Sequence, residues 1–184
     1  MTAPHGQAAS PPRETFDSFY ARCYPGMLRL AYAVTGPGAH LEELVQDSFA
    51  AVYRAYGRGE LREPEFYVKR TVINRCRRWQ GSQARRRQFE TVTEIGGELE
   101  PSARGPLHED TIANRDRLWC ALQRLSFHQR AAITLHFYED LSYEDIAETL
   151  REPDGVPLNL VTVRSWVTRG LARLHKEMTD DHSI

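Results

Sequence analysis

The sequence predicts an all-α protein of two small helical domains joined by a flexible linker. Apolar residues recur at helical spacing in both halves of the chain, and no stretch shows the alternation typical of a strand. From about residue 88 to 106 the periodicity disappears, and glycine and proline mark a flexible connection. We therefore expect a disordered N-terminus over residues 1–12, a first domain over 13–87, a linker over 88–109, a second domain over 110–178 and a tail over 179–184.

The first domain is expected to open with two helical segments. Residues 16–34 carry apolar side chains at helical spacing, but Pro25 should break or kink the helix because it lacks a backbone N–H. The stripe over residues 41–53 is the strongest of the chain, and acidic residues stand in its first turn, where they favour a helix start. Residues 57–64 should form a loop.

The third helix should begin near Pro64 and combine an apolar face with a cationic one. The apolar positions are Val68, Val72, Cys76 and Trp79. The opposite positions are Arg70, Asn74, Arg77 and Arg78. Residues 69–87 contain eight cations and no carboxylate. Such a helix is able to pack on a core and contact phosphates at once.

The second domain carries clear helix starts. Ser126 with Gln129 forms a capping box, Ser142 with Asp145 repeats that geometry, and Asn159 should cap the last helix. The core stripe of that last helix should consist of Leu160, Val163, Val167, Leu171, Leu174 and Met178. The small Ala147 would allow two helices to cross steeply, as in a helix-turn-helix. The alternative is an ordinary antiparallel helix pair with a polar outer face.

The charges are unevenly distributed although the net charge is only −1. A second cationic stretch follows the one in the third helix and consists of Arg164, Arg169, Arg173 and Lys176. Two separated cationic segments suggest two contacts with a polyanion such as nucleic acid. A solvated helix surface would explain the charge alone about equally well.

Several other classes of protein lack support in the sequence. The three cysteines are far apart, form neither a disulfide framework nor a zinc pattern, and are expected to be buried free thiols. The histidines show no ligand spacing, and no phosphate-binding loop or nucleophile elbow is present. We expect no metal, no cofactor and no enzyme activity. No apolar run is long enough to cross a membrane, so we expect a cytoplasmic protein.

Five segments carry a resemblance to a known family. Residues 125–130 (LSFHQR), 141–150 (LSYEDIAETL) and 162–174 (TVRSWVTRGLARL) resemble domain four of the extracytoplasmic-function (ECF) sigma factors of bacterial RNA polymerase. Residues 43–49 (ELVQDSF) and 66–74 (FYVKRTVIN) resemble the polymerase-docking and promoter-melting helices of domain two. The two matches occur in the right order and are separated by a linker. The resemblance implies promoter-specific transcription initiation, with core RNA polymerase and promoter DNA as partners and an anti-sigma factor as a common further partner.

The resemblance also implies roles for individual residues. The helix that docks on the polymerase clamp corresponds to Leu44, Gln46, Asp47 and Phe49. The part that captures the minus-ten element as single strand corresponds to Arg62, Phe66, Tyr67, Lys69, Arg70, Asn74, Arg77 and Arg78. The helix that meets duplex DNA at the minus-thirty-five element corresponds to Thr162, Arg164, Ser165, Trp166, Arg169 and Arg173. Aromatic and cationic side chains suit single-stranded bases, although Phe66 or Tyr67 is equally well explained as a core residue.

Two departures from the family pattern concern the second domain. The connection over residues 151–158 is longer than usual, and Trp166 stands where a basic residue is common. Three other functions remain open at this stage: a free-standing helix-turn-helix regulator, an inactive relative that only occupies polymerase, and, most distant, an enzyme. Specific initiation by core polymerase only when the chain is added would distinguish a sigma factor from these three.

Overall fold

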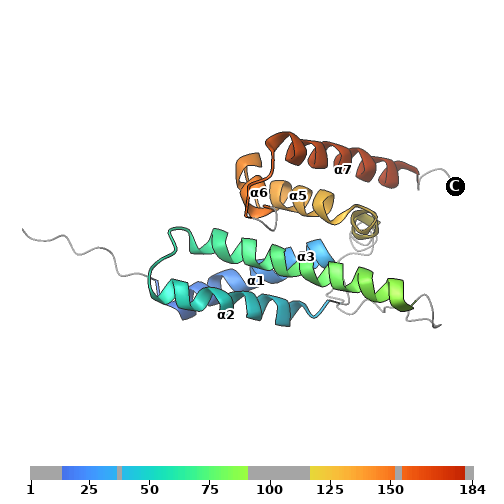
Figure 1. Cartoon of the computed structure of the whole chain (residues 1–184). Coiled ribbons are helices and arrows are strands. Elements are labelled where there is room, and N and C mark those ends of the chain that lie inside the picture. Colours follow the sequence, from blue (N-terminus) through green and yellow to red (C-terminus); the bar gives the residue numbers. More distant parts are fainter. Residues whose placement is uncertain (1–13, 37–38, 91–116, 152–154, 181–184) are drawn as a thin grey trace, which may run out of the picture.

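The computed structural model describes residues 14–36, 39–90, 117–151 and 155–180, and regular structure within them is entirely helical. The helices are α1 (Phe16–Thr35), α2 (Leu41–Gly57), α3 (Pro64–Glu90), α5 (Phe127–Phe137), α6 (Tyr143–Thr149) and α7 (Leu160–Asp180) (Figure 1). A further helical segment spans residues 117–123. The expected N-terminal disorder, residues 91–109 of the expected linker and the last residues of the expected tail lie outside the described residues. No described helix is long and apolar enough to cross a membrane.

Helices α1, α2 and α3 form the first unit, which holds the aromatic core of the molecule. Phe19 and Phe49 are 1% exposed, and their rings lie 5.8 Å apart edge to face. Helix α1 is continuous through Pro25, so of the two expected outcomes, a break or a kink, the break is wrong. The side chain of Pro25 is exposed, whereas Cys23 and Met27 on either side of it are buried. Burial of the apolar face therefore outweighs the one backbone hydrogen bond that proline removes.

The second unit comprises the described residues 117–180, with α5, α6 and α7 packed together. The capping box at Ser126 is present in full, and the Oγ atom of Ser142 accepts a hydrogen bond from the Asp145 N–H at 3.0 Å. The Oδ1 atom of Asn159 accepts from the Val161 N–H at 2.8 Å, so α7 begins as predicted. Leu171, however, is 39% exposed, and the buried position beside it is Gly170. The glycine lets α7 approach Ile133 of α5 closely.

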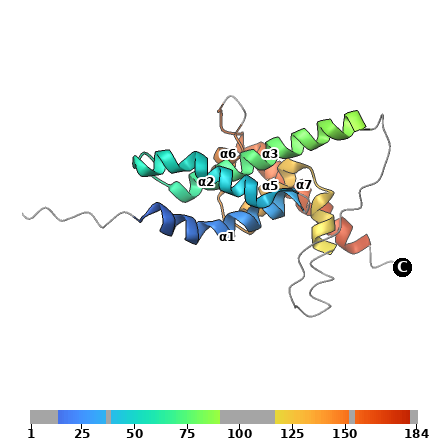
Figure 2. The ribbon, with the colours of Figure 1, turned by 90° about the horizontal axis from the view of Figure 1, so that it is seen from below.

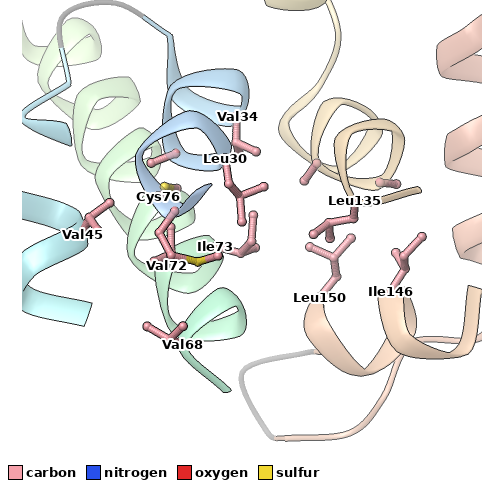
Figure 3. Close-up of a cluster of buried hydrophobic side chains, with 14 of the residues drawn as sticks. Leu30, Val34, Val45, Val68, Val72, Ile73, Cys76, Leu135, Ile146 and Leu150 are labelled. Carbon is pink, nitrogen blue, oxygen red and sulfur yellow. The ribbon is translucent and has the colours of Figure 1, made fainter. Parts of the chain in front are cut away.

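The two units share one apolar core. Leu30 and Ile73 of the first unit face Leu135 and Leu150 of the second, and all four are at most 2% exposed (Figure 3). Helix α5 packs against α1, and α6 contacts α3. In Figure 2, which is seen from below, the second unit accordingly lies behind the first. Two helical units are present as predicted, but their mutual packing was not part of the prediction.

The cysteines follow the prediction in two cases of three. Cys23 and Cys76 are buried free thiols, and burial raises the pKa of Cys76 to about 12. Cys120 is a free thiol as well but is exposed, because it lies on the outer side of the helical segment over residues 117–123.

Candidate nucleic-acid interface

Helix α3 is anchored by the apolar face that the sequence predicted. Val68, Val72 and Cys76 are completely buried against α1 and α2, and Trp79 is half-buried. The helix continues to Glu90, past the expected domain boundary at residue 87. This anchoring fixes which way the remaining side chains of α3 point.

The opposite face of α3 does not lie open to solvent as expected. Arg70, Asn74 and Arg77 are half-buried, and only Arg78 of the four predicted cationic-face residues is exposed. The reason is Ile73, which lies three residues from Arg70 and four from Arg77 and is 1% exposed. An apolar side chain in the middle of this face draws the second unit over it.

Carboxylates of the second unit pair with the covered cations. The Nζ atom of Lys69 lies 2.6 Å from a carboxylate oxygen of Glu139, and both side chains are almost fully enclosed, at 8% and 12% exposed. The Nη1 atom of Arg70 lies 3.5 Å from a carboxylate oxygen of Glu148, which also pairs with Arg151. Close enclosure keeps water from screening the Lys69–Glu139 pair.

Further along α3, Arg77 contacts the second unit through a backbone group. Its Nη1 atom donates to the carbonyl oxygen of Arg151 at 3.3 Å. Arg78, one residue on, is exposed. The predicted minus-ten residues from Phe66 to Arg78 are thus brought together along one helix, but three of the five cations in the set, Lys69, Arg70 and Arg77, are engaged within the chain.

The aromatic and loop members of the predicted minus-ten set lie at the N-terminal end of α3. Phe66 is half-buried and, with Lys69, lines a cavity of about 410 Å³ that Arg22 and Leu141 also line. Tyr67 is 41% exposed, and Arg62 before the helix is exposed. Of the two aromatic residues, Tyr67 is therefore the one that solvent reaches more freely.

The predicted polymerase-docking residues of α2 divide into an outer and an inner group. Gln46 and Asp47 are exposed and Leu44 is half-buried. Phe49 is 1% exposed in the aromatic core, so its assignment as a contact residue is wrong: its side chain is not available to a partner. Sequence reasoning also missed Arg75 of α3, whose Nη1 atom lies 3.0 Å from an Asp47 carboxylate oxygen.

Helix α7 presents the second cationic surface. Arg164, Arg169 and Arg173 are exposed, and Thr162 and Ser165 are half-buried. The Arg164 guanidinium lies 5.5 Å from the ring centre of Tyr143 at the start of α6, which is a cation–π distance. These arginines remain open to solvent, unlike the cations in the middle of α3.

Trp166, the departure from the family pattern, is packed rather than free. Its ring stacks on His128 of α5 with centroids 4.6 Å apart and planes 25° apart. Ala147 is 3% exposed at the crossing of α6 and α7, and its carbonyl oxygen accepts from the Leu158 N–H at 3.2 Å. The long connection is therefore tied back to α6, while its residues 152–154 lie outside the described ones.

A buried arginine in α5 was not singled out from the sequence. Arg130 is 2% exposed, and its guanidinium donates to the carbonyl oxygens of Val34, Leu122 and Gln123 and to the side-chain oxygen of Gln123. Burial lowers the pKa of Arg130 to about 10. Only its position in the LSFHQR segment, four residues after a helix N-cap, could have suggested an inward direction.

Comparison with protein families places both units in one class. Residues 19–86 match the model of sigma-70 region 2, and residues 115–174 match the model of sigma-70 region 4. The order of these two regions is the order that the sequence resemblance implied.

Named relatives agree with these matches. The RNA polymerase sigma-E factor of Streptomyces antibioticus is 31% identical over 138 residues, which cover 74% of this chain and 69% of the relative. The sigma-E factor of Streptomyces coelicolor is 28% identical over 169 residues, covering 89% and 85%. The sigma-H factor of Pseudomonas aeruginosa is 27% identical over 180 residues, covering 90% and 87%.

A solved structure shares the fold. It is the co-crystal structure of the sigma factor RpoE in complex with the anti-sigma factor NepR from Bartonella quintana. The TM-score is 0.66 at 22% sequence identity, and the match covers 91% of this chain and 98% of the other.

Proposed function

The chain belongs to the ECF sigma factors of bacterial RNA polymerase, and from this premise we propose how its residues divide the work of initiation. As a sigma factor it binds core RNA polymerase and promoter DNA and directs transcription initiation. Within the chain, residues 13–87 act as sigma domain 2 and residues 110–178 as sigma domain 4. The observation that carries the proposal is that two cationic helices, α3 and α7, are each anchored on a helical unit of their own.

Helix α3 and the loop before it capture the unpaired minus-ten strand. Arg78, Tyr67 and Arg62 are accessible and offer charge and an aromatic face to separated strands. Lys69, Arg70 and Arg77 join them along the same helix. Opening duplex DNA costs about 1–2 kcal/mol of stacking per base step, which the captured bases and cationic contacts must offset.

Helix α7 holds the duplex at the minus-thirty-five element. Its exposed arginines, Arg164, Arg169 and Arg173, are suited to phosphates or to guanine edges. Thr162 and Ser165 stand on the same helix near its N-terminal end. A tryptophan is unable to neutralise a phosphate, so we assign Trp166 no phosphate contact. Its stacking on His128 instead supports the helix that carries the arginines.

Contact with the polymerase goes through α2. Gln46 and Asp47 are exposed one turn into the helix, and Leu44 is partly accessible beside them. Arg75 holds the Asp47 carboxylate in place from α3. We assign the docking surface to these outer residues, with Phe49 as the core residue beneath.

We propose two further points, which family membership supports. The chain acts by binding and carries out no catalysis, in the cytoplasm where polymerase and DNA meet. The solved relative is held by an anti-sigma factor, and we propose that this chain has an inhibitory protein partner of the same kind.

In vitro transcription with purified core polymerase on candidate promoters tests the proposed function. Specific initiation only when the chain is added is the expected result. Tight specific binding of duplex DNA in the absence of polymerase, without initiation in its presence, would indicate a free-standing regulator instead. Binding to core polymerase with no initiation on any promoter would indicate an inactive occupant of polymerase.

A further inference from the structure

The first turn of α7 carries an apolar side chain that the core does not use. Val161 is 72% exposed, which makes it the most exposed large apolar residue in the described part of the chain. Val163 and Val167 of the same helix are at most 2% exposed and hold its inner side in the core. Packing within the chain therefore gives no reason for a branched apolar side chain at Val161.

Val161 lies in line with an arginine of the proposed minus-thirty-five surface. Val161, Arg164 and Thr168 follow one another at spacings of three and four, so they share one side of the helix, and all three are exposed. Figure 1 shows α7 on the side of the second unit that is turned away from α1–α3. A duplex that Arg164 contacts therefore also reaches Val161, one turn nearer the start of the helix.

The start of α7 is held in place by hydrogen bonds. The Val161 N–H donates to the Oδ1 atom of Asn159 at 2.8 Å, and the Leu158 N–H donates to the carbonyl oxygen of Ala147 at 3.2 Å. Because the backbone N–H of Val161 is already used, the residue offers a ligand its two methyl groups. A valine in a helix keeps essentially one side-chain rotamer, so these methyl groups are in position before DNA binds.

From this placement we propose that Val161 reads a thymine of the minus-thirty-five element by contact with the methyl group on C5 of the base. The inference rests on the proposed function of α7. In a helix-turn-helix, the N-terminal residues of the second helix meet base edges in the major groove. The thymine methyl is the apolar group that base pairs present there, and it is recognised by apolar side chains. Covering Val161 with DNA therefore favours thymine over the other bases.

This role differs from that of the neighbouring arginines. Arg164 is suited to a phosphate or a guanine edge and acts through charge, whereas Val161 discriminates between bases without charge. Phosphate contacts determine how steeply affinity falls with salt concentration, and an apolar base contact does not change that slope. Base preference and salt dependence are therefore two separate measurements of the two kinds of contact.

The test uses the complex of core polymerase with the full chain, bound to a promoter fragment on which that complex initiates. Each thymine of the minus-thirty-five element is replaced in turn by uracil, which lacks the methyl group but keeps the base pair. Competition binding measures the affinity of each fragment. V161A removes the two γ-methyl groups, and V161I keeps a branched apolar side chain. The matched control V156A makes the same change as V161A at a residue that is 56% exposed outside α7.

With the unaltered chain, uracil at one thymine should lower the affinity roughly threefold, as expected when one methyl group is lost from an apolar contact. V161I and V156A should keep this loss. In V161A the same replacement should lower the affinity by less than about 1.5-fold, because the partner of the methyl group is gone. The salt slope of V161A should equal that of the unaltered chain. Its midpoint of thermal unfolding should also be unchanged, because the side chain is exposed.

Three results overturn the inference: a minus-thirty-five element without thymine, an element in which no thymine responds to uracil, or a response that V161A retains. In each of these cases initiation by the unaltered chain continues, so the proposed function stands while the inference fails. If the unaltered chain directs no initiation by core polymerase on any promoter, the proposed function fails, and the inference fails with it.

Discussion

Arg130 of α5 reaches across the boundary between the two units and donates from Nε to the carbonyl oxygen of Val34, 2.6 Å away at the end of α1. Within the described residues its guanidinium donates only to neutral oxygen atoms, and burial lowers the pKa of Arg130 to about 10. A cation is well placed at this point, because the C-terminal end of a helix carries partial negative charge. Gly36, with φ of 92°, is the C-cap of α1 and lies two residues after Val34.

Replacement of Arg130 should cost stability. R130M keeps much of the side-chain volume but leaves the Val34 and Gln123 oxygens without their donor. We expect the free energy of unfolding to fall by about 2 kcal/mol, in urea denaturation followed by circular dichroism. The control is R124A. Arg124 is 65% exposed and pairs with Glu177 at the surface, so its loss should lower the free energy of unfolding by less than about 0.5 kcal/mol. Equal losses in the two variants would contradict a special role for the buried guanidinium.

Loss of Arg77 and Arg78 should act on promoter opening rather than on polymerase binding. R77A/R78A should reduce open-complex formation, detected by permanganate reactivity of unpaired thymines, by about tenfold. It should also lower the salt slope of that step by about 2, since two cations are removed. R85A/R86A, which removes the same charge from later turns of α3, is the control and should have the smaller effect. An equal loss of core binding and opening would count against the assignment.

Loss of Arg169 and Arg173 should weaken the contact of α7 with the minus-thirty-five element. R169A/R173A should weaken protection of the minus-thirty-five region in a footprint of the polymerase complex while leaving binding to core polymerase intact. Two lost contacts at about 1 kcal/mol or more each correspond to a loss of roughly thirtyfold or more in promoter affinity. The arginines are exposed, so the stability of the chain should not change by more than about 0.5 kcal/mol. Undiminished protection would remove α7 from the proposed interface.

Two glycines in helices should respond to alanine in opposite directions. A Cβ atom at Gly170 would meet the Cδ1 atom of Ile133 at 2.5 Å, so G170A should destabilise the chain by about 1 kcal/mol despite the better helix propensity. A Cβ atom at Gly81 meets nothing within 4 Å, so G81A should stabilise it by about 0.5–1 kcal/mol. Calorimetry measures the midpoint of thermal unfolding, which should fall in G170A and rise in G81A. A stabilising G170A would show that α5 and α7 are less closely packed at this point.

The three thiols should differ in reactivity. With a brief pulse of iodoacetamide at pH 8, mass spectrometry should find Cys120 modified and Cys23 and Cys76 protected, whereas all three react in denaturant. The pKa of Cys76 rises from 9.0 to about 12 on folding, so the unfolded chain loses that proton first. Stability should therefore fall as the pH rises through this range. Rapid native modification of Cys76 would contradict its burial.

Local signals in the sequence were sufficient for the helices themselves. The caps at Ser126, Ser142 and Asn159 depend on neighbours within a turn or two, and the structure has them as predicted. The stripe of α2 is buried in its middle, from Val45 to Val52, but Tyr53 at its end is 57% exposed. The break expected as one outcome at Pro25 did not occur, because the local cost of proline is small beside the burial of the residues around it. The stripe of α7 was misjudged at Leu171, because only the position of α5 reveals that Gly170 is the close contact.

The cationic face of α3 was the harder problem. Spacing placed Arg70, Asn74 and Arg77 on one side correctly but gave no information on what covers that side. Ile73 among them was the one local sign of burial, and its partners Leu135 and Leu150 lie more than sixty positions along the chain. Pairings of that separation depend on tertiary structure, as the enclosed Lys69–Glu139 contact also does.

The Lys69–Glu139 pair has a consequence for hybrid proteins. Its members come from different matched regions, Lys69 from the one over residues 19–86 and Glu139 from the one over residues 115–174. A chimera that takes one region from a relative without an opposite charge at the matching position leaves a buried charge without its counterpart, which is strongly unfavourable. Promoter preferences are therefore best exchanged between such proteins by grafting the outward-facing turns of α7 alone.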